Sequence, residues 1–210
     1  MNRRAFLTLL SASAMAGFLP GSEAQARGKP GIFNSKEYRS TNLKAFDQWT
    51  KVVRRSRGAL IKTADWKAFL AETDRKLPKQ KLLEKVNGFA NRKPYIVDPV
   101  NWGVEDYWAT PTEFLARNGD CEDYAITKYM ALKRLGFDPA KMRVVAVQDL
   151  NLRAGHAILA VYMDNDIMVL DNQVVLVTPA DRIHHYQPKF SINEKAWWRH
   201  RGGPKKKRKS

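Results

Sequence analysis

The sequence contains a single cysteine, Cys121, and only four histidines among its 210 residues. An internal disulfide is therefore excluded, and the cysteine is either a small buried side chain or a reactive thiol. No stretch offers the roughly 18 to 20 consecutive apolar residues of a membrane-spanning helix. With 44% hydrophobic and 10% aromatic residues, the chain lacks the composition of a disordered protein. We therefore expect one globular domain with a packed core.

Acidic residues are in the minority, because 37 lysines and arginines face 21 aspartates and glutamates. Of the net charge of +16, residues 1–26 carry +1 and the basic run Lys205–Lys209 carries +5, which leaves +10 for residues 27–204. A body this basic favours anionic partners without choosing among them. We expect the basic tail to contact anionic envelope surfaces, and we expect no specific nucleic-acid target.

The N-terminus has the layout of a cleavable export signal. Arg3 and Arg4 precede an apolar stretch from Ala5 to Leu19, and small residues end the segment at Ala24-Gln25-Ala26. We predict export to the periplasm by the Sec or twin-arginine route, with cleavage after Ala26. An uncleaved anchor is the alternative interpretation.

Three further segments are predicted after the signal. Residues 27–41, rich in glycine, proline, serine and charge, predict a flexible lead-in, and residues 42–201 form the folded domain. Residues 202–210 form a basic disordered tail. The tail resembles a nuclear-import peptide, which contradicts an export signal, so a short arm for anionic surfaces or an appendage fits the chain better.

Apolar residues recur at helical spacing in the first half of the domain. Helices are predicted around Leu43–Val53, Trp66–Thr73 and Lys79–Asn91, and Pro78 separates the last two. Residues 93–111 combine three prolines with the aromatic cluster Trp102, Tyr107 and Trp108. We call this segment the aromatic loop, and we predict that it is ordered but irregular and either walls an active site or covers the core.

The second half predicts one helix followed by strands. The helix runs from Cys121 to Leu135 and is closed by Gly136. Runs rich in Val, Ile and Leu predict strands at Met142–Gln148, His156–Met163, Ile167–Leu170 and Val174–Val177. Helices first and antiparallel strands second predict an α+β fold, with the cysteine helix packed on an antiparallel sheet.

Cys121 follows the turn Asn118-Gly119-Asp120 and opens its predicted helix. Unpaired N–H groups and the helix dipole stabilise an anion at this end, which favours a thiolate nucleophile and an oxyanion formed during attack. A thiolate that cleaves amides also needs a general acid, and His156 at a strand start is the candidate. A lone histidine there is otherwise structural.

Asp171 ends the next apolar strand and is the candidate to orient His156. A hairpin with a four-residue turn at Tyr162–Asn165 predicts that the two residues lie directly opposite each other. A tight two-residue turn does not place them so. Polar turn chemistry also explains a terminal aspartate without any catalytic role.

Three acids surround the cysteine, and their charge opposes a second negative charge on the sulfur. Asp120, Glu122 and Asp123 are either capping and first-turn carboxylates or ligands of a hard cation such as Ca²⁺, whose charge relieves the repulsion. The full twelve-residue EF-hand pattern is absent. Both interpretations remain open on the residues alone.

Four segments together resemble the bacterial transglutaminase-like cysteine peptidases, and among them the LapG-type periplasmic proteases. They are Trp108–Leu115, Gly119–Ala125, His156–Leu159 and Leu170–Asn172. The resemblance extends from about Phe46 to Trp198. It implies a papain-like or transglutaminase-like core with Cys121 as nucleophile, His156 as acid and base, and Asp171 as the residue that orients it.

The same resemblance implies calcium dependence, with Asp120 and Glu122 as the metal ligands. It also implies a large surface adhesin, cut at its periplasmic end, as substrate, and an inner-membrane cyclic-di-GMP receptor as partner, so that the enzyme regulates attachment and biofilm. Two other classes are considered. The same groups support acyl transfer by a transglutaminase, and a basic envelope-binding module would leave Cys121 structural.

Overall fold

The computed structural model describes residues 31–59 and 63–204. The predicted export signal, the first residues of the lead-in and the end of the basic tail lie outside these ranges. No helix in the described part of the chain is long and apolar enough to cross a membrane. The helices are α2 (Asp47–Ala59), α3 (Ala64–Glu72), α4 (Lys79–Asn91), α5 (Asp98–Asn101), α6 (Pro111–Arg117) and α7 (Cys121–Arg134), with short 3-10 turns η1 (Ile32–Asn34), η2 (Pro139–Lys141) and η3 (Ala180–Arg182).

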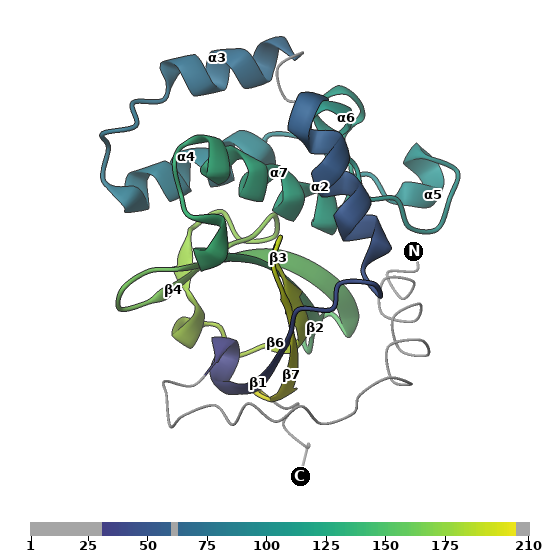
Figure 1. The fold of residues 1–210 in the computed structure, drawn as a ribbon, viewed down its shortest axis with the longest axis vertical. Helices are drawn as coiled ribbons and strands as arrows, with labels where there is room; N and C mark the ends of the chain where they lie inside the picture. Colours follow the sequence, from purple (N-terminus) through teal and green to yellow (C-terminus); the bar gives the residue numbers. More distant parts are fainter. Residues whose placement is uncertain (1–30, 60–62, 205–210) are drawn as a thin grey trace.

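The strands form one antiparallel sheet in the order β1-β7-β6-β2-β3-β4-β5. Their bounds are β1 (Ser35–Ser40), β2 (Met142–Asp149), β3 (Ala154–Tyr162), β4 (Ile167–Leu170), β5 (Thr178–Pro179), β6 (Tyr186–Ile192) and β7 (Trp197–Gly202). The longer helices gather on one side of the sheet, as Figure 1 shows. The predicted α+β fold, with the cysteine helix packed on an antiparallel sheet, is confirmed.

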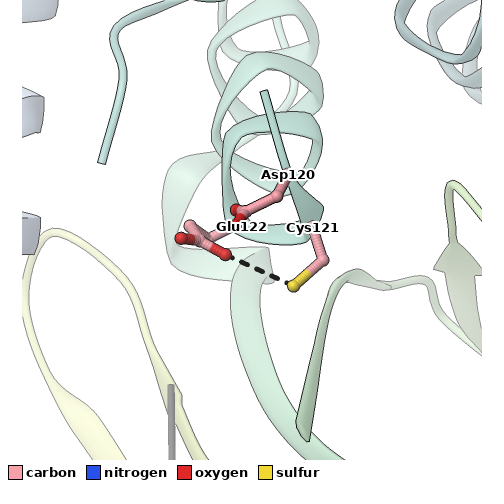
Figure 2. Close-up of side chains that lie close together, drawn as sticks. All are labelled: Asp120, Cys121 and Glu122. Atoms are coloured by element: carbon pink, nitrogen blue, oxygen red, sulfur yellow. Dashed lines mark hydrogen bonds between the residues drawn. The ribbon is translucent and has the colours of Figure 1, made fainter. Parts of the chain in front are cut away.

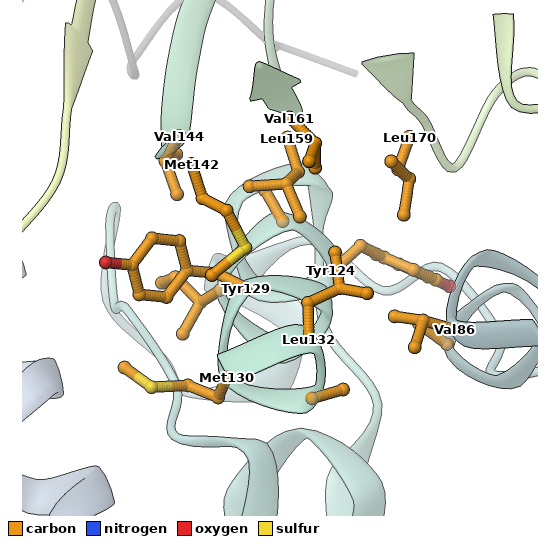
Figure 3. Packing of buried hydrophobic residues seen from close by; sticks show 14 of the residues in the cluster. Val86, Tyr124, Tyr129, Met130, Leu132, Met142, Val144, Leu159, Val161 and Leu170 are labelled. Carbon is orange, nitrogen blue, oxygen red and sulfur yellow. The ribbon is translucent and has the colours of Figure 1, made fainter. Parts of the chain in front are cut away.

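The main core lies between α7 and the centre of the sheet. Figure 3 shows Tyr129 and Leu132 of α7 facing Met142 and Leu159 of the two central strands, with Val86 approaching from α4. Side chains alternate between the faces of a strand, so the neighbouring residues of β2 point to the opposite side. There they form a second cluster with residues of η1 and η3. The sheet is therefore buried on both faces, which explains why its central strands are almost wholly apolar.

The helix predictions hold well where apolar periodicity is strong. Helix α4 has the predicted bounds, and α7 ends one residue before the predicted end. Gly136 follows with a φ of 95°, the left-handed conformation that favours glycine at a helix end.

The prediction of a flexible lead-in is wrong for residues 31–40. This segment forms η1 and β1, and β1 pairs with β7 along the edge of the sheet. Ile32 and Phe33 are buried in the second cluster. The segment is polar on average, but two apolar side chains suffice to close the far face of the sheet.

The predicted strand Val174–Val177 is also wrong, because these residues form bends between β4 and β5. Val175 and Leu176 are 82% and 75% exposed. The β-branched composition suggested a strand, but no neighbouring strand is available to these residues. Strands β1, β6 and β7 were not predicted. Helix α6 was not predicted either, although Thr110 and Glu113 form its capping box, a signal that is visible in the sequence.

Candidate active site

Cys121 is the first residue of α7, and Asp120 precedes it in extended conformation. The approach to the helix is tight, since a Cβ added to Gly119 would collide with the Asp123 carboxylate. The Cys121 thiol is buried, and the backbone N–H of Ala157 hydrogen-bonds its sulfur. Ala157 directly follows His156 on β3, so the helix start and this strand meet at the thiol.

His156 and Asp171 contact each other, with 2.8 Å between Nε2 and Oδ1. Both side chains are almost completely buried. The predicted register is nevertheless wrong. Tyr162 pairs with Ile167 and Met163 N donates to Asp166 O, so the turn is the tight two-residue type. Continuing the ladder places Ile158 opposite Asp171, and His156 reaches the carboxylate diagonally, two residues further along the strand.

Asp171 is held by more groups than sequence reasoning found. Tyr186 Oη donates to Oδ2 at 2.7 Å, and the Gln173 backbone N–H donates to Oδ1 at 2.9 Å. Burial alone raises the pKa of this carboxyl, but the hydrogen bonds from His156, Tyr186 and Gln173 outweigh it and hold the pKa below its usual value. Asp171 is therefore ionised at neutral pH. Tyr186 lies on β6, a strand without a clear sequence signal.

The nucleophile and the base have other partners in this structure. Cys121 Sγ lies 3.3 Å from Oε2 of Glu122, a contact drawn in Figure 2. On the imidazole, Nε2 is taken by Asp171, and the Gln173 side-chain amide lies 3.3 Å from Nδ1. Among the described residues no hydrogen bond joins Cys121 to His156. In this structure the thiol and the imidazole are therefore paired with other groups and not with each other.

Five acids gather beside the thiol. The residues predicted as metal ligands, Asp120 and Glu122, flank Cys121 at the start of α7, as Figure 2 shows. Asp123, the third acid that the sequence placed beside the cysteine, joins them from α7, and the structure adds Asp98 and Asp106 from the aromatic loop. Their oxygen atoms fall into groups whose members lie within 4.8 Å of one another. The aromatic loop, which the sequence predicted either to wall an active site or to cover the core, therefore supplies part of an acid cluster beside the thiol.

Burial and mutual repulsion oppose the charge on these acids. Burial, followed by the nearby Asp120, raises the pKa of Asp98 to about 7. The same two causes raise the pKa of Glu122 and that of Asp123 well above their usual values. Burial, again followed by Asp120, also raises the pKa of the Cys121 thiol. Without a compensating cation, the cluster opposes formation of a thiolate.

The cluster fits a hard divalent cation. Asp98 Oδ1 is buried without a hydrogen-bond partner among the described residues, although its Oδ2 accepts from Tyr107 N at 2.5 Å. A buried acceptor without a donor is costly, and a metal ion is one way to satisfy it. One candidate group includes the Cys121 sulfur, but the other two, Asp98 with Asp106 and Glu122 and Asp98 with Asp120 and Asp123, offer only carboxylate oxygens, the ligands that calcium prefers.

The aromatic loop is shaped to present its acids. Gln48 Nε2 and Trp108 Nε1 both donate to Asp106, at 2.6 and 3.1 Å. Ala109 N donates to Asp123 Oδ1 at 2.7 Å and so ties the loop to α7. Trp108 is buried in the main core, and Trp102 packs against Tyr107 at its edge, with the two rings tilted by 35°. Both tryptophans thus support the loop by packing.

The family model described as "Bacterial transglutaminase-like cysteine proteinase BTLCP" matches residues 48–202, which span the helices and nearly all of the sheet. The chain belongs to this family. It is therefore a cysteine peptidase, a hydrolase with a transglutaminase-like fold. Cys121 is the only cysteine in the chain, so a cysteine nucleophile of this family can be no other residue.

Solved structures of Legionella pneumophila LapG are similar to this chain. The calcium-bound structure is 30% identical, with a TM-score of 0.59, and the match covers 75% of this chain and 90% of that one. An EGTA-treated structure is 29% identical, with a TM-score of 0.59, and covers 74% and 86%. A further LapG structure is 30% identical, with a TM-score of 0.58, and covers 73% and 86%. No curated protein sequence matches the chain.

Proposed function

We propose that this cysteine peptidase is exported to the periplasm, requires calcium, and cuts the periplasmic end of a large surface adhesin. The observation that carries the calcium requirement is the buried acid cluster beside Cys121, in which Asp98 Oδ1 lacks a partner. The calcium-bound form of a similar LapG supports it. The signal-like N-terminus supports export, and the resemblance of the cysteine and histidine segments supports an adhesin as substrate.

Peptide hydrolysis then proceeds from the groups described. The Cys121 thiol transfers its proton to His156 Nδ1, and the thiolate attacks the scissile carbonyl carbon. The backbone N–H groups at the start of α7 face the developing oxyanion. The tetrahedral intermediate collapses to a thioester as the imidazolium protonates the departing amine. His156 next takes a proton from water, which hydrolyses the thioester and restores the thiol.

Asp171 keeps the imidazole in the orientation that these proton transfers need. Its carboxylate accepts a hydrogen bond from the Nε2–H group, which leaves Nδ1 as the nitrogen that exchanges protons. Tyr186 and the Gln173 backbone hold the carboxylate in place from two other directions. Each of the three hydrogen bonds stabilises the ionised form of Asp171, so the imidazolium gains a fixed negative partner.

Asp98, Asp106, Asp120, Glu122 and Asp123 are the residues that would hold calcium. When bound, the ion supplies positive charge that offsets the repulsion among these acids and favours a negative sulfur. Coordination of Glu122 would also withdraw it from the Cys121 thiol, to which it is now hydrogen-bonded. This role is electrostatic and is separate from the proton transfers carried out by His156.

Regulation and contacts in the envelope follow from the same proposal. A cyclic-di-GMP receptor in the inner membrane would sequester the peptidase and so control attachment and biofilm. The net positive charge of +10 in residues 27–204 would hold the enzyme near anionic envelope surfaces.

The test is to incubate the mature protein with envelope proteins of its own host, with calcium or with EGTA. We expect a discrete fragment in calcium that disappears with EGTA, with Cys121→Ala and with His156→Gln. His184→Gln is the matched control, because His184 is exposed and outside the site. It should cleave like the unmodified protein.

Three results would contradict the proposal in different ways. Cleavage that persists in EGTA would remove the calcium requirement, and cleavage that survives Cys121→Ala would remove the nucleophile. Heavier, cross-linked products that depend on Cys121 would replace hydrolysis by acyl transfer. Sequencing the new fragment ends identifies the substrate and shows whether it is an adhesin.

A further inference from the structure

The side chain of Gln173 contacts the nitrogen that the proposed mechanism needs. Its Nε2 lies 3.3 Å from His156 Nδ1, while the other ring nitrogen is bonded to Asp171. Since Asp171 is ionised, Nε2 carries the ring proton and Nδ1 is a bare acceptor. The Gln173 amide is a donor, so the contact is a hydrogen bond to the lone pair that must accept the thiol proton.

The main chain keeps Gln173 close to the histidine. Its own N–H donates to Asp171 Oδ1 at 2.9 Å. On either side, α4 holds the segment through two asparagines. Asn91 Nδ2 donates to Asp171 O at 2.8 Å, and Asn87 Nδ2 donates to Val175 O at 2.9 Å. The backbone of residues 171–175 is therefore fixed at both ends.

The side chain of Gln173 is less constrained than its backbone. Gln173 is an exposed residue, whereas His156 is only 2% exposed. The amide therefore reaches from the surface onto a buried ring. A single neutral hydrogen bond is weak enough to exchange, and the glutamine amide can hydrogen-bond water once it leaves. Rotation of one surface side chain would free Nδ1 without moving the backbone.

We propose that Gln173 is a positioning residue that occupies His156 Nδ1 in the substrate-free enzyme and must be displaced before Cys121 can transfer its proton. This rests on the proposed function, in which His156 Nδ1 accepts the proton of Cys121. The proton moves from Sγ to Nδ1 and no other bond changes in this step. While the amide is in place, Nδ1 is occupied and proton transfer to it waits until Gln173 is displaced.

The test uses the calcium-loaded full chain and two readouts. In a Cys121→Ser background, where no thiol can protonate the ring, nitrogen-15 NMR of the histidines reports the contact directly. We expect Gln173→Ala and Gln173→Leu to move the Nδ1 resonance of His156 and to leave Nε2 in place. Leucine keeps the bulk over the ring but removes the donor. Gln80→Ala, at the start of α4 where the amide bonds Glu84, is the matched control and should change neither resonance.

The second readout is alkylation of Cys121 by iodoacetamide in the unmodified background. Loss of one neutral hydrogen bond to Nδ1 predicts alkylation about threefold to tenfold faster in both Gln173 variants at neutral pH. An unchanged Nδ1 resonance, or a rate that stays the same or falls, overturns the role of Gln173. Failure of the peptidase proposal looks different, because His156→Gln would then leave the alkylation rate of Cys121 unchanged.

Discussion

Two groups of polar and ionisable side chains, most of them buried, lie in the same molecule. They differ in whether their negative charges are matched by positive ones. The acid cluster beside Cys121 contains five carboxyl groups, and none of the ion pairs of the described residues involves Asp98, Asp106, Glu122 or Asp123. The second group, which we call the edge cluster, consists of Glu37, Arg143, His200, Ser35 and Ser191. It lies where β1, β7, β6 and β2 run side by side.

The edge cluster pairs its acid with a base. Arg143 pairs with Glu37 at 2.7 Å, with side chains 13% and 8% exposed. His200 bonds Ser35 Oγ at 2.8 Å and Ser191 Oγ at 2.9 Å. The two clusters show that burial of charge does not by itself indicate function. Balanced, bonded charge is structural, whereas buried like charge requires a ligand or protons from solvent.

The largest effect that separates the clusters is the response to calcium. At calcium about a thousandfold above its dissociation constant, binding should raise the free energy of unfolding by about 4 kcal/mol over the value in EGTA. Asp98→Asn should abolish most of this difference, while His200→Gln should retain it. Urea unfolding with calcium and with EGTA measures both. Equal stability in the two buffers would make the acid cluster no different from the edge cluster.

The next largest effect is expected when the charge balance of the edge cluster is removed. Arg143→Met leaves the buried Glu37 carboxylate without its cation and should lower the free energy of unfolding by about 3 kcal/mol. The loss should be the same with calcium and with EGTA. Lys51→Met is the control, because Lys51 and Asp47 form an exposed pair that contributes less than about 1 kcal/mol. A calcium-dependent loss in Arg143→Met would mean that the clusters are coupled.

The smallest predicted effect is on the free energy of unfolding at acid pH. Burial, followed by the nearby Arg143, lowers the pKa of His200 to about 4 and outweighs Glu37, which acts in the opposite direction. The unfolded chain binds a proton below about pH 6.5, but the folded chain does so only near pH 4, so stability is lost as pH falls through this window. His200→Gln should therefore reduce the loss of unfolding free energy between pH 6.5 and 4 by about 2 kcal/mol. Parallel stability curves for the two proteins would contradict the assignment of a buried, neutral His200.

Local patterns determined how much of this arrangement was predictable. Helices α4 and α7 follow from apolar spacing and a closing glycine, and Cys121 at a helix start follows from the preceding turn. These signals come from neighbouring residues in the sequence. The contact of His156 with Asp171 was expected from two adjacent strands, but its register depends on a turn whose type the polar sequence did not specify.

The parts that were missed depend on distant residues. Strand β1 forms because β7, more than 150 residues later, offers its edge. Asp98 and Asp106 join the acid cluster because an irregular loop folds over the start of α7, and no fixed spacing marks such ligands. Tyr186 reaches Asp171, and the side chain of Gln173 reaches His156, through tertiary packing. None of these contacts has a short-range pattern that sequence reasoning can detect.

The most direct test of the central claim uses the single cysteine. Intact-protein mass spectrometry after brief exposure to iodoacetamide reports the reactivity of Cys121 alone, because no other cysteine exists in the chain. We predict that calcium-loaded protein is alkylated at least about tenfold faster than the same protein in EGTA or the calcium-loaded His156→Gln variant, the effect of one unit in thiol pKa. Equal rates in all three samples would contradict a nucleophile activated by His156 and a calcium-filled acid cluster.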